Sequence, residues 1–253
     1  MASTLKDDII INPNDLFAQI SNVSTTAPYS TFTLPLGSRA TTGDGRDFRL
    51  VQAGASALII GQVQQCPALV ANGTGTAIAA AIGATSLALT ISSSTYAAGA
   101  LTGGFFVTYG TVANGGGQNL RIANNTAVTS GTTITITLDD AVQTAITTSA
   151  NFVLVPPKYA GVIQMPTTAT GSVAGVAINN LAASYYGWIQ TKGFANVLIQ
   201  GTPAIGTAVA CPATTAGACA VTSGTTSVPN MNIGTTLATG TDGRYGPVDL
   251  LIS

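Results

Sequence analysis

The chain has 253 residues, only 7% of them charged, and its 8 Lys and Arg against 9 Asp leave a formal net charge of −1. It contains no His and no Glu, which excludes a Ser-His-Asp or Cys-His nucleophile and an imidazole metal ligand. Eight scattered cations at a pI near 5.0 give no electrostatic footprint for nucleic acid, and the composition argues against a conventional enzyme.

Residues 1–35 differ in composition from the rest of the chain and are interpreted as an N-terminal arm that becomes ordered against a partner. Asn12 and Pro13 favour the start of a short helix ending at Ile20, and Phe17 within it is a candidate interaction residue. The first residues lack the basic region and apolar core of a signal peptide, so we expect synthesis in a host cytoplasm. No apolar run approaches the ~20 residues that span a bilayer, so no membrane partner is expected.

Short strands are predicted from residue 36 onward. Asp47–Ala53 alternates polar and apolar residues, as a half-buried strand does, and residues 57–63 favour a second strand interrupted by a glycine. Pro67 and Pro156-Pro157 mark boundaries, because proline cannot sit in a central strand. We therefore expect a main β domain, with a second β domain inserted into it. The main domain comprises residues 36–67 and 158–253, and the inserted domain comprises residues 68–157.

The inserted domain contains a weak internal repeat. Residues 86–92 and 133–138 alternate cleanly, and each is followed by a small-residue spacer and an aromatic strand, at 104–109 and 151–155. The two copies are about 46 residues apart. Two copies are too few for a solenoid, and similar hairpin modules within one sandwich explain the repeat equally well.

The second part of the main domain has further strand candidates separated by Gly, Asn, Pro and Thr at the spacing of a sandwich or barrel. These candidates are residues 161–164, 174–178, 187–190 and 195–199. Helical turns fit only Ala77–Ala84, Ala141–Thr148 and Asn179–Tyr185. The predicted fold class is all-β, a short-strand barrel or sandwich with an inserted second β domain and an N-terminal arm.

No catalytic, metal or cofactor site is predicted. The adjacent carboxylates Asp139 and Asp140 suit a turn better than acid–base catalysis, because neighbours on a strand point to opposite faces. Cys66, Cys211 and Cys219 lack a C-x-x-C pair and are interpreted as buried thiols, although Cys211 and Cys219 are close enough in sequence to bridge a loop.

Charged side chains gather at two Asp-Gly-Arg turns. Five of the seventeen charged residues lie between Arg39 and Arg49. The candidate interaction residues here are Arg39, Asp44 and Arg46 in the first turn region, and Asp242 and Arg244 in the second. Asp-Gly supplies tight-turn geometry, and an adjacent Arg can fold back onto a carboxylate. Salt bridges within or between subunits are favoured over recognition of a receptor by an exposed turn.

An aromatic segment holds the only Trp of the chain. Tyr185, Tyr186 and Trp188 are candidate interaction residues, because aromatic clusters bind sugars or anchor interfaces. The alternative is that Trp188 points into the β core while its neighbours point outward.

The segment from Tyr186 to Gly193, with Gly161–Gln164 and Gly175–Ala177 before it, resembles the head decoration (cement) proteins of tailed bacteriophages. The closing runs Ile233–Thr236 and Tyr245–Ile252 add to the likeness, which covers residues 158–253 best and 39–253 loosely. The resemblance implies a β-rich, commonly trimeric protein that binds the major capsid protein on the outside of the virion. It transfers no catalytic residue.

Two functions therefore stand as expectations. The first is a virion structural protein that binds and stabilises the assembled head as an oligomer, with neutral Thr- and Ala-rich faces between subunits. The second is a receptor- or glycan-binding module of a phage tail or cell surface, which requires an exposed aromatic platform. An enzyme is disfavoured, because Lys158 and Lys192 stand in no Ser-x-x-Lys setting.

Overall fold

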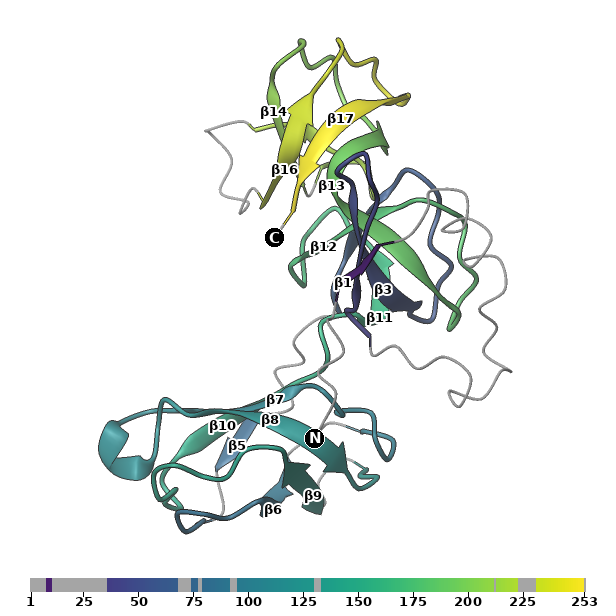
Figure 1. Ribbon diagram of the computed structural model, residues 1–253. Coiled ribbons are helices and arrows are strands. Elements are labelled where there is room, and N and C mark those ends of the chain that lie inside the picture. The colour runs from purple at the N-terminus through teal and green to yellow at the C-terminus, as the bar shows by residue number, and fades with distance from the viewer. Residues whose placement is uncertain are drawn as a thin grey trace. The chain divides into compact units, whose positions relative to one another are not determined.

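The computed structural model describes residues 8–10, 36–67, 74–76, 79–91, 95–129, 133–211, 213–222 and 231–252. It is an all-β protein with a closed five-stranded barrel and a second sheet. The chain forms two compact units, Met1–Pro67 with Lys158–Ser253, and Ala68–Pro157. We call them the main unit and the inserted unit (Figure 1).

A single eleven-stranded sheet builds the main unit, in the order β1-β2-β3-β11-β4-β12-β13-β17-β16-β14-β15. Its strands are β1 (Asp8–Ile10), β2 (Arg39–Thr41), β3 (Asp47–Ala53), β4 (Val63–Gln65), β11 (Ala160–Gln164), β12 (Val173–Ala177), β13 (Tyr186–Leu198), β14 (Ala208–Cys211), β15 (Ala220–Val221), β16 (Met231–Thr236) and β17 (Tyr245–Leu251).

The barrel closes because β3 also pairs with β13. Its five strands are therefore β3, β11, β4, β12 and β13, and they bury a cluster of small and branched side chains that includes Val51, Val162, Ala174 and Ile189. The long strand β13 belongs to two parts of the sheet. Its first half pairs with β3 in the barrel, and its second half pairs with β17. A separate core, which includes Val197, Ile233 and Val248, lies under that second half.

The inserted unit has a six-stranded sheet in the order β5-β10-β7-β8-β9-β6. Its elements are β5 (Thr74–Thr76), β6 (Ser86–Thr90), β7 (Phe105–Tyr109), the short 3-10 helix η3 (Val112–Asn114), β8 (Asn119–Asn125), β9 (Thr133–Leu138) and β10 (Asn151–Val155). Alternate residues of these strands point into one core, as the burial of Leu87, Leu89, Ile134 and Ile136 shows.

The two sequence copies in the inserted unit pair with each other. Strand β6 pairs with β9, and β7 pairs with β10. The registers are symmetrical: Leu87 faces Ile136 while Leu89 faces Ile134, and the rings of the equivalent residues Phe106 and Phe152 lie 5.6 Å apart. The two copies of the repeat thus lie in one sheet. An approximate two-fold rotation exchanges β6 with β9 and β7 with β10.

Three local predictions are wrong. Residues 57–63 do not form a strand interrupted by glycine; Leu58 makes an isolated bridge to Leu181, Gly61 adopts a positive φ, and β4 begins at Val63. Residues 187–190 and 195–198 belong to one strand, β13, rather than to two, and Ile199 lies just beyond its end in an isolated bridge to Cys219. The described residues of 77–84, 141–148 and 179–185 hold no helix, because their backbones bond to other segments, as in the Ala80–Ile146 bridge.

The proposed arm is only partly described. Asp8–Ile10 forms β1 and pairs in parallel with β2, so this stretch joins the edge of the main sheet. The predicted helix of residues 12–20, with Phe17, lies outside the described residues.

Candidate functional site

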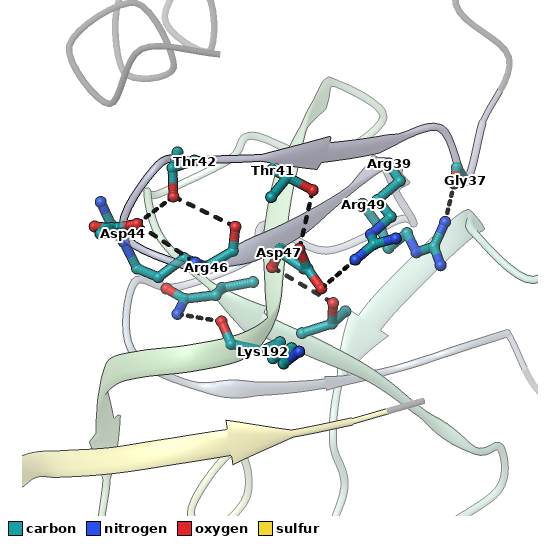
Figure 2. Close-up of polar contacts among 11 residues, drawn as sticks. Gly37, Arg39, Thr41, Thr42, Asp44, Arg46, Asp47, Arg49 and Lys192 are labelled. Atoms are coloured by element: carbon teal, nitrogen blue, oxygen red, sulfur yellow. Dashed lines mark hydrogen bonds and ion pairs between the residues drawn. The ribbon is translucent and has the colours of Figure 1, made fainter. Parts of the chain in front are cut away.

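Strands β2 and β3 form a hairpin whose turn carries the first Asp-Gly-Arg sequence (Figure 2). The backbone N–H of Thr42 donates to the Arg46 oxygen at 3.0 Å, and the N–H of Gly45 donates to the Thr42 oxygen at 3.0 Å. Gly45 has a φ of 85°, a conformation that glycine adopts without steric cost. The turn therefore fixes the positions of Asp44 and Arg46.

Two carboxylates pair with two of the three arginines of this hairpin, and the third, Arg49, donates to the Gly37 oxygen. Asp47, only 7% exposed, accepts hydrogen bonds from Arg39 Nη2 at 2.8 Å and from Thr41 Oγ1 at 3.0 Å. Asp44 accepts from Arg46 Nε at 2.8 Å and from the Thr42 hydroxyl. Both ion pairs lie within one chain. The carboxylates of Asp44 and Asp47 are therefore already paired with arginines of the same hairpin.

The Thr42 hydroxyl, followed by the backbone and side chain of Arg46, lowers the pKa of Asp44 from 3.8. A lowered pKa in the folded state means that ionised Asp44 favours folding above pH 3.8, and this contribution is lost as the pH falls below that value. The Arg46 guanidinium also lies 5.6 Å from the centre of the Phe48 ring, which keeps its side chain against the hairpin.

Substitution of Asp47 by Asn is expected to lower the free energy of unfolding by about 1–2 kcal/mol, because it removes the buried carboxylate charge that accepts hydrogen bonds from Arg39 and Thr41. Urea unfolding followed by the fluorescence of Trp188 measures this change. Asp44→Asn is the matched control, since its pair with Arg46 is half exposed and such pairs contribute about 0–1 kcal/mol. Equal losses in the two variants would contradict the assignment.

The residues Tyr185, Tyr186 and Trp188 do not form the exposed aromatic platform that a sugar site needs. Trp188 is 2% exposed and packs in a core cluster with Ala40, Phe48 and Leu50. Tyr185 packs partly buried against the barrel core, and Tyr186 is half-buried. The interpretation with Trp188 in the β core is therefore correct, but its neighbour Ile189 does not point outward, because it is buried in the barrel core.

The second Asp-Gly-Arg turn lies in a different loop, between β16 and β17. Asp242 accepts the N–H of Gly201 at 2.6 Å, and Gly243 has a φ of 68°. Arg244 is exposed, and its backbone N–H donates to the Thr241 oxygen. Asp242 thus holds two loops together, and the described ion pairs do not join it to Arg244.

The three cysteines are free and buried. Cys211 and Cys219 belong to the same core cluster, and burial raises the pKa of each thiol to about 12, with Cys219 adding to the shift of Cys211. Burial also raises the pKa of Cys66. These thiols stay protonated at neutral pH.

Native protein at about pH 8 is expected to leave Cys211 and Cys219 unmodified by iodoacetamide, because the thiolate is the reactive form. Because burial raises the pKa of both thiols, their protonated form favours the folded state. This contribution to stability is complete below pH 9 and is lost as the pH rises toward 12. Intact mass before and after denaturation measures the modification. Rapid alkylation of either residue in native protein would contradict the burial.

Nothing in the described residues points to acid–base or metal chemistry. Asp139 lies 3.5 Å from Arg121 Nε in an exposed ion pair, and no group of three or more His, Cys, Asp or Glu gathers within the described ranges. None of the described segments is a helix long and apolar enough to cross a membrane.

A surface with exposed large apolar side chains on β13, β17 and β16 was not predicted from sequence. Cross-strand partners share one face of a sheet, and here they include Lys192 with Leu251 and Phe194 with Asp249. Phe194 is 59% exposed and Leu251 is 75% exposed. We call this side of the three strands the outer face. Alternation in residues 245–251 was its only sequence signal, and the register that brings Phe194 beside them is not visible in sequence.

Comparison of the chain with protein-family models, with curated proteins and with solved structures gave no match.

Proposed function

We propose that the protein is a virion structural protein, a capsid decoration protein that binds the major capsid protein on the outside of an assembled phage head as an oligomer. The observation that carries the proposal is the outer face, where Phe194 and Leu251 stand exposed on a regular sheet, as expected of a chain that works in an assembly of several chains. Large apolar side chains grouped on a rigid surface are typical of protein interfaces.

The shortage of charge supports the same role. Only 7% of residues are charged, and in the first hairpin Asp44 and Asp47 pair with arginines of their own chain. A neutral surface joins other subunits without the cost of removing water from unpaired charges. Contacts that are individually weak add up when they repeat over a capsid lattice. The role is structural, and the trimer that the resemblance implies belongs to the proposal.

The glycan-binding alternative has no observation in its favour, because the burial of Trp188 removes the platform on which it depended. Quenching of the Trp188 fluorescence by oligosaccharides remains a direct check, and no quenching is expected.

Purified protein is expected to co-sediment with expanded, undecorated heads of the phage that encodes it, and the decorated heads are expected to resist heat better than bare ones. Sedimentation through a sucrose cushion and electron microscopy of the pellet measure the binding. Unexpanded proheads serve as the control. Protein that stays in the supernatant under all conditions would overturn the proposal.

A further inference from the structure

The outer face is continuous over three paired strands. Along β13 and β17 the outward pairs are Lys192 with Leu251, Phe194 with Asp249, Asn196 with Pro247 and Leu198 with Tyr245. On the opposite side of the same strands, Val197, Val248 and Leu250 are buried in the core. The outward residues therefore cannot turn inward, and their apolar side chains remain in solvent in a single copy.

A hollow of about 470 Å³ lies on this face. Phe194, Leu251, Lys192, Asp249, Asn232 and Thr235 line it, together with the turn at Asp44 and Gly45. Phe194 and Leu251 are also the most exposed apolar side chains of these strands. One surface thus offers both a hollow and the apolar side chains that can fill a similar hollow.

Two charges stand among these apolar groups, one of each sign. Lys192 and Asp249 are diagonal neighbours on the face, because Lys192 is opposite Leu251 and Asp249 is opposite Phe194. Both are exposed, and within the described residues neither side chain forms an ion pair. The other carboxylate at the hollow, that of Asp44, is paired with Arg46.

We propose that the outer face is the docking surface for a second copy of this chain, in a two-fold contact. A two-fold axis brings a surface against itself, so such a contact needs a self-complementary patch. In this contact Lys192 of each copy lies opposite Asp249 of the other. The Phe194 side chain of each copy packs against the hollow of the other copy. A patch with a cation and an anion outside any described ion pair, set among apolar neighbours, meets this requirement.

This inference deepens the proposed function and rests on it, because it names the surface through which copies associate. A two-fold contact joins copies in pairs, so by itself it predicts a dimer. If the chain also forms the trimer that the resemblance implies, the same contact joins two trimers into a particle of six chains. The association is tested without capsids. A failure here leaves the capsid binding open, and a failure of capsid binding leaves this contact open.

Light scattering after size-exclusion chromatography, with sedimentation velocity over a concentration series, tests the contact in the full chain. The wild type is expected to contain an even number of copies. Lys192→Asp and Asp249→Lys each place like charges together, and each is expected to raise the dissociation constant at least about tenfold. Phe194→Ser is expected to do the same, while circular dichroism stays unchanged because the side chain is exposed.

Charge exchange tests whether Lys192 of one copy meets Asp249 of the other. Lys192→Asp mixed with Asp249→Lys is expected to associate, because each copy then meets the opposite charge at both positions. The double variant is expected to associate with itself for the same reason. Asp140→Lys, an exposed charge change in the inserted unit, is the matched control and should behave as wild type.

Three results would overturn the inference. The first is a monomeric wild type at all concentrations. The second is a particle mass that Lys192→Asp and Phe194→Ser leave unchanged. The third is a mixture of the two charge variants that stays apart, which would show that this face meets a different surface. A monomeric wild type whose capsid binding is lost in Phe194→Ser would assign the face to the capsid protein instead.

Discussion

Phe152→Ala is expected to unfold the inserted unit while the main unit stays folded. The Phe152 side chain is fully buried and its ring lies 5.6 Å from that of Phe106, in a core whose described residues all belong to the inserted unit. Removal of a buried phenyl ring costs about 3–5 kcal/mol. That loss is a large fraction of the stability of a unit of this size.

Hydrogen exchange read on peptides from each unit measures the effect, and the fluorescence of Trp188 reports on the main unit alone. Peptides of β7 and β10 should exchange quickly in the variant, while those of β13 keep their protection. Phe105→Ala is the control, since this neighbouring side chain is partly exposed and should cost much less. A parallel loss of protection in β13 would show that the two units unfold as one.

Strands with clear alternation were predictable from sequence. Asp47–Ala53, Thr133–Leu138 and Asn151–Val155 are strands with the bounds that the sequence predicts. The last two each have one buried face and one more exposed face, which is the arrangement that alternation reports. The prolines at 67 and 156–157 stand where the chain passes between its two units.

The errors have physical causes that a single sequence does not reveal. Strand β13 was divided in two because Lys192 and Gly193 interrupt its apolar pattern, yet each half pairs with a different strand and the ladder continues through the interruption. Residues 57–63 have the composition of a strand, but tertiary contacts bend them around Gly61, which lies against the Tyr245 ring.

The candidate site was predicted unevenly. The ion pairs of Arg39 and Arg46 could be predicted, because their partners Asp47 and Asp44 are close to them in sequence and lie in the same hairpin. The outer face depends on a pairing between β13 and β17, which are distant in sequence, so the position of Phe194 beside Asp249 needed the structure.

Gly234→Ala is expected to cost about 3 kcal/mol and to open the sheet at β16. A Cβ atom on Gly234 would collide with the backbone oxygen of Asp249, and a backbone atom in a central ladder cannot move aside without breaking hydrogen bonds. The close approach arises beside a register shift between β14 and β16, where Gly234 faces Val209 and Asn232 faces Ala210. Urea unfolding followed by circular dichroism and hydrogen exchange of β16 and β17 peptides measure the loss.

Gly43→Ala is the matched control for this variant, because a Cβ atom there would have no neighbour within 4 Å. Comparison with Phe194→Ser then separates two roles of the same sheet. Gly234→Ala should lose stability and self-association together, because Gly234 lies beneath the outer face, whereas Phe194→Ser should lose self-association alone. If Gly234→Ala were as stable as Gly43→Ala, the close approach of β16 to β17 would be wrong, and with it the rigid sheet on which the outer face depends.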